Sequence, residues 1–529
     1  MGDDQTPLEK KRRSDEPLTP PWVAALKELS LREEQIQADH SPLFTNTSGQ
    51  PVVYFEKGRL SKKGLTLRVG VLLSGGQAAG GHNVITGLYD GIKKIDSKST
   101  LVGFLGGPGG LVDHKYQELT ENILAEYRNT GGFDLIGSGR TKIETEEQFK
   151  ASLKVCEQLK LDGLVIIGGD DSNTNAAFLA EFFVKNGCST KVIGVPKTID
   201  GDVKNPFVEI SFGFDTASKT YSEMIGNIER DAISAKKYYH FIKLMGRSAS
   251  HIALECALQT HPNVTLIGEE IAAEQKTLSQ VTEEIAGVIE SRSKQGRDYG
   301  VVLIPEGVIE FIPEIKALIA ELNVESRVER LSSSAQTTFK LLPKEVQQQL
   351  LLDRDPHGNV QVSHVATEQL LIHTVKEALK KRGFSGKFNP IAHFLGYEGR
   401  SAFPSHFDAN YCYALGHVAS ALIAGGRTGY MCFISNLAQG VAAWKGGGVP
   451  LTALLGVEKR KGKDKWVIRK ALVDLKGAPF QHFSSQREKW KVQDHYRFPG
   501  PIQFYGPAEI CQQITISLEL EAQLTRGVS

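Results

Sequence analysis

Cysteine is scarce in this 529-residue chain, and the six cysteines show no pairing pattern. None belongs to a CxxC pair or to another spacing that holds a metal ion. Scattered thiols of this kind are typical of reduced proteins, so we expect a cytoplasmic location and no disulfide framework. Long apolar runs are missing too. None approaches the ~20 residues that cross a membrane, and no hydrophobic signal segment is present, so we expect no membrane association.

Charge of one sign is not in excess either. The 62 Lys and Arg residues balance 61 Asp and Glu residues, which leaves a formal net charge of +1 at pH 7. A balanced chain gives no electrostatic reason to expect nucleic acid or an anionic membrane as a partner. The hydrophobic content of 40% and the length are those of an ordinary globular protein with two or three domains.

The most informative stretch, residues 161–202, predicts two buried strands joined by a helix. The apolar run Leu164–Ile167 is typical of a parallel strand. The residues that follow this strand are Gly168, Gly169, Asp170, Asp171, Ser172 and Asn173. Ser172 and Asn173 are favourable N-caps, and the helix predicted after them has an apolar stripe typical of a face packed on a sheet.

The second strand of this stretch, Lys191–Val195, leads into the sequence PKTIDGD at 196–202. Functional groups of open α/β sheets gather at the carboxyl ends of the strands, so the two turns are expected to face one crevice. Mg²⁺ prefers carboxylate and phosphate oxygens, and glycines allow backbone N–H groups to approach an anion. The pair of turns therefore predicts a metal and phosphate site, whereas GGDD alone fits a solvated surface turn equally well.

A glycine-rich loop follows the first predicted core strand, Leu67–Leu73. It reads SGGQAAGGHN at 74–83 and precedes a predicted helix, a geometry that binds anions. The loop matches neither GxGxxG nor the P-loop, which argues against dinucleotide and Walker-type sites. Strands predicted at 100–105 and 134–136 also end in glycine-rich turns. The second of these turns carries Arg140, which either neutralises phosphate charge or forms a surface salt bridge.

The rest of the chain predicts a second α/β unit, an insertion and two extensions. Strand and helix patterns alternate from 215 to 322, as in a parallel sheet covered by helices. Residues 324–389 contain few strand signals, and amphipathic helices are predicted near 344–352 and 367–382. Leu26–Ile36 is predicted as a short helix of the N-terminal extension, and the C-terminal stretch is predicted to be irregular.

Six turns, in this order along the chain, resemble those of the phosphofructokinase family. They are SGGQ…GGHN at 74–83, GGDDS at 168–172, PKTIDGD at 196–202, MGRS at 245–248, PEG at 305–307 and GYEGR at 396–400. The resemblance covers about residues 66–440 and is to the pyrophosphate-dependent branch, in the long form similar to the plant β subunit. Ala79 stands where the family usually has proline, which bears on the rigidity of the loop and not on its ligands.

The resemblance implies two doubly wound α/β domains of the phosphofructokinase type, with a mainly helical insertion and terminal extensions. On this basis residues 66–205 form a pyrophosphate- and Mg²⁺-binding domain, completed by about 408–455. Residues 206–323 and 390–407 form a domain that binds fructose 6-phosphate. The implied N-terminal extension, insertion and C-terminal extension are 1–65, 324–389 and 456–529.

The resemblance also implies an activity of glycolysis and gluconeogenesis, the reversible transfer of a phosphoryl group from pyrophosphate to the C1 hydroxyl of fructose 6-phosphate. The implied catalytic residues are Asp200 as general base, Asp202, Lys197 and Arg140. The implied pyrophosphate-binding residues are Gly75, Gly76, Asp171 and Lys197, and Asp170 would bind the cofactor Mg²⁺. The implied sugar-phosphate residues are Thr198, Ile199, Asp200, Lys237, Tyr238, Met245, Gly246, Arg247, Glu306, Tyr397, Glu398, Gly399 and Arg400. Lys237 and Tyr238 resemble a pair contributed by a partner subunit, which implies a homodimer with shared sites.

The choice of donor depends on Asp171 and Lys197, because ATP-dependent relatives carry glycine at both positions. A carboxylate at 171 would lie near the α-phosphate of ATP. Two like charges ~4 Å apart at an effective dielectric constant of ~20 repel by about 4 kcal/mol, on the order of a thousandfold in affinity. Our hypothesis is that Asp171 excludes ATP while Lys197 assists pyrophosphate. An ATP-dependent phosphofructokinase is the closest alternative.

Alternatives of other classes stay open at this point. A non-catalytic regulatory subunit, as the plant α subunit is usually regarded, could dispense with Asp200, Asp170 and Lys197, and all three are present. An NAD or lipid kinase would share only the GGD turn and would lack PKTIDGD and MGR. Sedoheptulose 7-phosphate is an alternative acceptor that the sequence leaves open.

Overall fold

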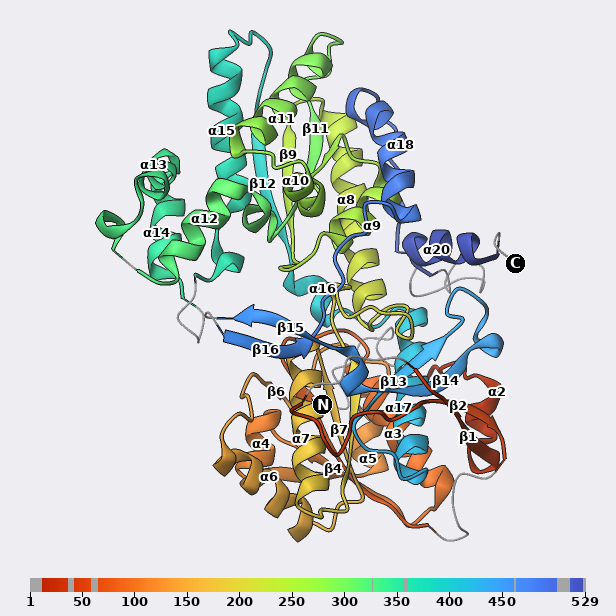
Figure 1. Ribbon diagram of the computed structural model, residues 1–529. Helices are drawn as coiled ribbons and strands as arrows, with labels where there is room; N and C mark the ends of the chain where they lie inside the picture. Colours follow the sequence, from red (N-terminus) through yellow and green to blue (C-terminus); the bar gives the residue numbers. More distant parts are fainter. Residues whose placement is uncertain are drawn as a thin grey trace. The chain divides into compact units, whose positions relative to one another are not determined.

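The chain forms two compact units in the computed structural model (Figure 1), which describes residues 12–36, 42–58, 65–325, 327–354, 360–460, 463–501 and 514–526. Unit 1 comprises residues 1–217, 400–471 and 503–514. Unit 2 comprises residues 218–399, 472–502 and 515–529. Both contain parallel strands that alternate with helices, so the predicted α/β class is confirmed.

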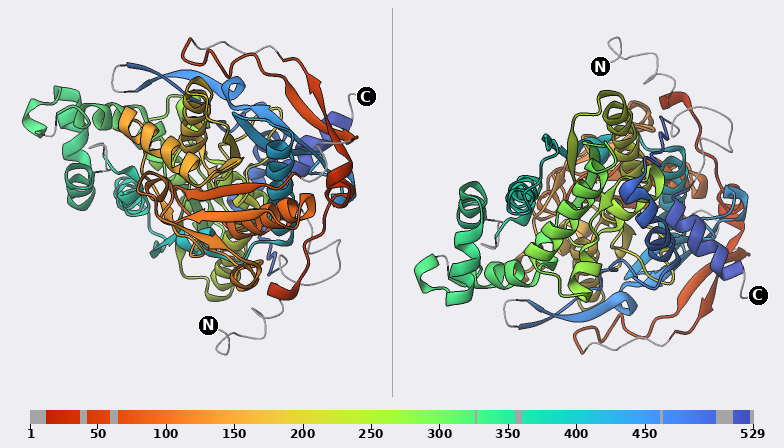
Figure 2. Two further views of the ribbon diagram at one scale, coloured as in Figure 1. Left: turned by 90° about the horizontal axis from the view of Figure 1, so that it is seen from below. Right: turned by 90° about the horizontal axis from the view of Figure 1, so that it is seen from above.

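Unit 1 is built on a sheet with ten strands among the described residues. In spatial order these are β1 (Leu29–Glu34), β2 (Val52–Lys57), β14 (Lys445–Pro450), β13 (Tyr430–Ser435), β8 (Lys191–Pro196), β7 (Gly163–Gly168), β3 (Arg68–Ser74), β4 (Thr100–Phe104) and β5 (Tyr116–Leu119), with β6 (Ser138–Gly139) paired to β3. The central strands from β13 to β4 are parallel and nearly all their residues are buried, as expected for a sheet covered on both faces. Figure 2 shows the N-terminal strands, in red, at one edge of this sheet, where β2 pairs with β14.

Two helices of unit 1, α3 (Gly81–Ile95) and α17 (His406–Ala424), pack at unusually short range. A Cβ atom at Gly416 would lie 2.3 Å from the carbonyl oxygen of Val84 and 2.4 Å from the amide nitrogen of Leu88. Glycine is therefore required at this crossing, because backbone atoms cannot move aside as a side chain can. Further helices among the described residues of unit 1 include α2 (Pro21–Ala24), α4 (Pro108–Val112), α5 (Glu121–Ala125), α6 (Glu146–Gln158) and α7 (Asp170–Lys185).

Unit 2 is built on a four-stranded, wholly parallel sheet in the order β10 (Val264–Thr265), β11 (Gly300–Pro305), β9 (Tyr239–Leu244) and β12 (Pro390–Leu395). Its main helices are α8 (Phe214–Ala235, from residue 218), α9 (His251–Thr260), α10 (Gly268–Ala273), α11 (Leu278–Ser293), α12 (Pro313–Leu322), α15 (Thr367–Lys381), α16 (Tyr397–Ser401, to residue 399), α18 (Ala478–Val492) and α20 (Ile516–Arg526). One continuous apolar core joins this sheet to the helices of the insertion, α13 (Ser333–Leu341) and α14 (Lys344–Leu352).

Several predicted elements differ from those observed. The helices predicted near 344–352 and 367–382 are confirmed as α14 and α15. The prediction of a helix at Leu26–Ile36 is wrong. Leu26–Glu28 forms a 3₁₀ turn, and the residues after it form β1, which pairs with β2. The strand predicted at 134–136 is a turn, and the strand that follows it, β6, has only two residues.

The C-terminal stretch is not irregular as predicted. It contains the hairpin β15 (Leu455–Arg460) and β16 (Lys463–Ile468) and the helices α18 and α20. The hairpin forms because β15 and β16 pair with each other, and α18 is packed against other helices of unit 2. Local sequence periodicity does not encode such tertiary contacts, so the two features could not be predicted from it.

Candidate active site

The glycine loop after β3 lies beside two cationic side chains of unit 1. Gly75 has a φ of +85°, and its N–H donates to the carbonyl oxygen of Gly139 over 2.9 Å. A Cβ atom at Gly75 would lie 3.4 Å from Nζ of Lys197, and one at Gly76 would lie 2.9 Å from Nη2 of Arg400. A small anion could therefore approach the backbone N–H groups of the two glycines and would also lie near two positive charges, as an anion-binding site requires.

Arg400 is held at this loop by a hydrogen bond that its guanidinium donates to the side-chain oxygen of Gln77. The resemblance assigns Arg400 to the sugar-phosphate residues, and within unit 1 it lies next to the loop assigned to pyrophosphate. Arg140, also assigned to the transferring group, is exposed and directly follows β6, which pairs with the end of β3. Three cationic residues of unit 1 thus lie on or next to the loop that ends β3.

The GGDD turn begins a helix earlier than predicted. Helix α7 starts at Asp170 with Gly169 as its N-cap, so Ser172 and Asn173 lie inside its first turn and do not cap it. The amide of Asn173 instead donates to the carbonyl oxygens of Gly168 and Val195, over 2.6 and 3.3 Å. It thereby ties the ends of β7 and β8 together.

Two acids in the first turn of α7 have different surroundings. Asp170 is 19% exposed, and its Oδ2 lies 3.5 Å from Nζ of Lys470. Asp171 is 46% exposed, and its Oδ1 lies 3.5 Å from Nζ of Lys142. Both carboxylates gain from the positive end of the helix dipole. Only Asp170 is also enclosed enough to serve in a site that excludes water.

The PKTIDGD turn after β8 is joined directly to the GGDD turn. The N–H of Lys197 donates to the carbonyl oxygen of Gly168 over 3.0 Å. Within the turn, the hydroxyl oxygen of Thr198 accepts from the N–H of Asp200 over 3.0 Å, which fixes the direction of the chain. Gly201 then has a φ of +73°, a conformation that glycine adopts without strain. The convergence of these two turns, predicted from the carboxyl ends of neighbouring strands, is confirmed.

Lys197 is the most enclosed cation of the site, at 6% exposure. Burial lowers the pKa of its ammonium to about 8, although the charges of Asp200, Asp170 and Asp202 favour the charged form. Arg400 opposes them and lowers the pKa of Lys197 further. Lys197 therefore carries a charge at neutral pH that water screens only weakly.

Asp202 is 4% exposed, and burial raises the pKa of its carboxyl group to about 7. The negative charge of Asp200 raises the pKa further, while the ammonium of Lys470 lowers it. Lys470 Nζ lies 3.9 Å from Oδ2 of Asp202 and also pairs with Asp170. Sequence reasoning missed Lys470, because this lysine lies more than 260 residues from either turn, in a segment without a recognisable motif.

The acids of these turns fit a divalent metal held together with a phosphate ligand. Among the described residues no group of three or more His, Cys, Asp and Glu side chains could hold a metal ion by itself. Mg²⁺ is commonly bound by one or two carboxylates plus the phosphate oxygens of the substrate. Asp170, partly enclosed and directly after Gly168 and Gly169, has the chemistry for that role.

A second cluster of sequence-predicted residues lies at the carboxyl ends of β9, β11 and β12 in unit 2. The carboxylate of Glu306 accepts from the N–H of Gly246 over 3.0 Å, which connects the MGR and PEG turns. In the third turn the carboxylate of Glu398 accepts from the N–H of Gly396 over 2.7 Å. The residues of this cluster are Met245, Gly246, Arg247, Glu306, Tyr397, Glu398 and Gly399. Tyr397 is 64% exposed, so an aromatic side chain there is accessible to a ligand.

Lys237 and Tyr238 lie at the opposite end of the same sheet. They precede β9, whereas Met245 and Arg247 follow it. Six strand residues at ~3.3 Å each separate the two ends by about 20 Å. Within one chain, Lys237 and Tyr238 therefore do not join the residues at the carboxyl ends of the strands.

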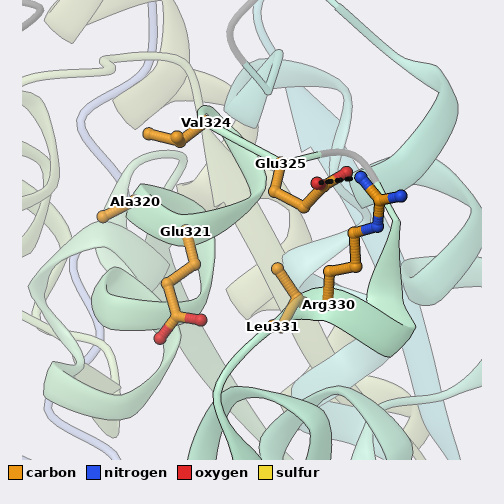
Figure 3. Close-up of a pocket in the computed structure, with 6 residues that line it drawn as sticks. All are labelled: Ala320, Glu321, Val324, Glu325, Arg330 and Leu331. Carbon is orange, nitrogen blue, oxygen red and sulfur yellow. Dashed lines mark hydrogen bonds and ion pairs between the residues drawn. The ribbon is translucent and has the colours of Figure 1, made fainter.

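A surface cavity of about 360 Å³ lies in the insertion (Figure 3) and contains none of the predicted site residues. Its lining is Ala320, Glu321, Val324, Glu325, Arg330 and Leu331. Glu325 and Arg330 form an ion pair of 3.4 Å across it, and Val324 is 90% exposed. The cavity is shallow, and the charges of Glu325 and Arg330 in it are paired with each other, so it does not compete with the turns of unit 1 as a catalytic site.

Comparisons with known proteins agree with this geometry. The family profile described as phosphofructokinase matches residues 68–423. The chain is 55% identical to the pyrophosphate–fructose 6-phosphate 1-phosphotransferase of Treponema pallidum (strain Nichols), over 90% of this chain and 89% of that protein. It is 52% identical to the subunit beta 1 of the enzyme of the same name from Arabidopsis thaliana, over 91% of this chain and 88% of that subunit.

The fold is also found in a solved structure. The crystal structure of a pyrophosphate-dependent phosphofructokinase from Nitrosospira multiformis matches with a TM-score of 0.55 at 18% identity, over 77% of this chain and 86% of that chain. Among the described residues, no helix combines the length and apolarity needed to cross a membrane. The family predicted from the six turns is confirmed, and this chain belongs to the phosphofructokinase family.

Proposed function

We propose that this chain transfers a phosphoryl group reversibly from pyrophosphate to the C1 hydroxyl of fructose 6-phosphate, giving fructose 1,6-bisphosphate and phosphate. The observation that carries the proposal is the junction of the two turns of unit 1. There, the buried ammonium of Lys197 lies among the carboxylates of Asp170, Asp200 and Asp202, next to the loop glycines. The names of the relatives that are about half identical to this chain support the same reaction.

Phosphoryl transfer requires an aligned nucleophile and charge neutralisation more than covalent chemistry by the protein. Asp200, held by Thr198, takes the proton from the sugar hydroxyl as general base. Asp202 supports it from the same turn. Lys197 and Arg140 offset the charge that develops on the transferring group, and the enclosure of Lys197 makes its charge more effective than it would be in water.

We assign the donor to Gly75 and Gly76, with Lys197 beside the loop and Asp171 in the first turn of α7. Members of this family are phosphotransferases that generally use a divalent metal, and we assign Mg²⁺ to Asp170. When bound, Mg²⁺ would neutralise charge on the pyrophosphate oxygens. Asp171 disfavours ATP because the additional α-phosphate of ATP would approach its carboxylate.

We assign the acceptor residues in each unit separately. Those of unit 1 are Thr198, Ile199, Asp200 and Arg400. The residues of unit 2 assigned to this role are Met245, Gly246, Arg247, Glu306, Tyr397, Glu398 and Gly399. Lys237 and Tyr238 lie at the other end of β9, so we assign them to the site of a second copy of this chain. The active enzyme is then a homodimer.

A coupled assay of the purified protein tests the proposal. Fructose 6-phosphate is offered with Mg²⁺ and either pyrophosphate or ATP, and formation of fructose 1,6-bisphosphate is followed. Rapid turnover with pyrophosphate and little with ATP is expected. Turnover with ATP alone would overturn the proposed donor, and no turnover with either donor would overturn the catalytic assignment. Asp200→Asn is the matched inactive control, since it removes the base and keeps the size of the side chain.

A further inference from the structure

Lys470 occupies a defined place between the two acid-bearing turns of unit 1. Its chain neighbours are anchored on either side. The N–H of Ile468 donates to Oγ1 of Thr174 in α7 over 2.9 Å, and the N–H of Ala471 donates to the carbonyl oxygen of Asp202 over 2.8 Å. The segment between β16 and residue 471 is thus attached to α7 on one side and to the PKTIDGD turn on the other, and these bonds fix the backbone around Lys470.

The ammonium of Lys470 links one carboxylate from each turn. It lies 3.5 Å from Oδ2 of Asp170 and 3.9 Å from Oδ2 of Asp202. The side chain of Asp202 is 5% exposed and that of Asp170 is 19% exposed, so water compensates their charges poorly. A cation that holds two enclosed carboxylates offsets their mutual repulsion, and its removal leaves negative charge without compensation.

We propose that Lys470 is a positioning residue that acts as the resident counter-ion of Asp170 and Asp202 in the metal-free enzyme, and that a divalent metal competes with its ammonium for Asp170. The assignment of the metal to Asp170 rests on the proposed function. The competition is expected from charge, because an ammonium 3.5 Å from Oδ2 of Asp170 would repel a second cation that approaches the same carboxylate. The segment that carries Lys470 thereby links the C-terminal hairpin to the loading of the donor site.

The test measures binding of Mn²⁺ to the full-length protein, from the electron paramagnetic resonance signal of free Mn²⁺. Inorganic phosphate is present to supply phosphate oxygens, and neither pyrophosphate nor the acceptor is added. Lys470→Met is expected to bind Mn²⁺ about tenfold more tightly than the wild type, because a nearby positive charge is removed from the metal's carboxylate. Lys470→Arg keeps the charge and is expected to stay close to the wild type. Lys465→Met is the matched control, since it removes an exposed lysine from β16 of the same hairpin.

The gain in affinity is expected to disappear when Asp170→Asn is combined with Lys470→Met. An Mn²⁺ affinity of Lys470→Met equal to or weaker than that of the wild type would overturn the proposal, as would a gain that survives Asp170→Asn. Absence of Mn²⁺ binding by all variants would also overturn it. If Lys470→Met fails to fold, Lys470→Gln serves the same comparison.

A kinetic readout separates positioning from a merely structural role. Lys470→Met is expected to lower the Mg²⁺ concentration that gives half-maximal activity with pyrophosphate about tenfold, while the KM for fructose 6-phosphate stays near its original value. Lys470→Arg is expected to stay close to the wild type in both constants. Equal changes in both constants would contradict the positioning role. The Mn²⁺ measurement uses no donor, so it tests the competition at Asp170 independently of activity. A wild type that is inactive with pyrophosphate would refute the proposed function, and the Mn²⁺ measurement would still decide whether Lys470 competes with the metal.

Discussion

Replacement of Asp171 by glycine tests how the site rejects ATP, and the structure changes the expected size of the effect. A repulsion of about 4 kcal/mol follows from two charges ~4 Å apart at an effective dielectric constant of ~20. In the structure, however, Asp171 is 46% exposed and its carboxylate lies 3.5 Å from Nζ of Lys142. Water and this lysine both screen the charge, so the repulsion falls toward the value in bulk water, about 1 kcal/mol at the same distance.

We therefore expect Asp171→Gly to improve kcat/KM for ATP by about tenfold and not a thousandfold, since 1.4 kcal/mol corresponds to one factor of ten. Asp171→Asn should give a similar gain, because it removes the charge and keeps the size. Lys142→Met should act in the opposite direction and weaken the use of ATP further. The assay is steady-state kinetics with fructose 6-phosphate and each donor in turn.

The result that would refute this reasoning is a kcat/KM for ATP that both Asp171 variants leave within about twofold of the wild type. ATP would then be excluded by shape or by another residue. A stability measurement accompanies the kinetics, because an acid in the first turn of a helix stabilises it by about 0.3–1 kcal/mol. A melting temperature close to that of the wild type shows that any change in donor use is local.

Three further outcomes are expected. Asp200→Ala should lower kcat by about 10²–10⁴-fold with little change in either KM, because a general base acts in the transition state, and a loss confined to KM would contradict that role. Since burial lowers the pKa of Lys197 to about 8, its ammonium is charged below that pH and neutral above it. The value of kcat/KM for pyrophosphate should therefore fall as the pH rises through about 8, and Lys197→Arg should shift this decline to higher pH. Gly416→Ala should destabilise the protein by about 1–3 kcal/mol in denaturant unfolding, because the added Cβ meets backbone atoms of Val84 and Leu88, and an unchanged midpoint would show that the two helices can separate at no cost.

Much of the local structure of unit 1 could be predicted from pattern alone. Apolar runs bounded by glycine predicted β7 and β8, and their carboxyl-terminal turns do converge, as the rule for parallel sheets requires. The predicted start of α7 was wrong by three to four residues. Ser172 and Asn173 are good caps in isolation, but β7 ends at Gly168 and the chain enters the helix directly after Gly169. Asn173 therefore lies inside the helix, where its side chain donates hydrogen bonds to the ends of β7 and β8.

The N- and C-terminal segments show where prediction from pattern fails. Leu29–Glu34 forms β1 because β2 is present to pair with it, although the local sequence also suits a helix. Residues 463–468 form β16 against β15 and lie on α7. Strand formation depends on a partner that is distant in sequence, and helix formation largely does not. This difference explains why α14 and α15 were located closely and β1 and β16 were missed.

The sequence by itself determined the α/β class, the family, and the acids and lysine of the two central turns, because these depend on residue type and on order along the chain. Only the tertiary structure decided how strongly each charge acts: it buries Lys197 and Asp202, leaves Asp171 half exposed beside Lys142, and brings Lys470 to Asp170. The physical reason is that Coulomb energies depend on distance and on access of water, and both are set by the packing of segments far apart in the chain.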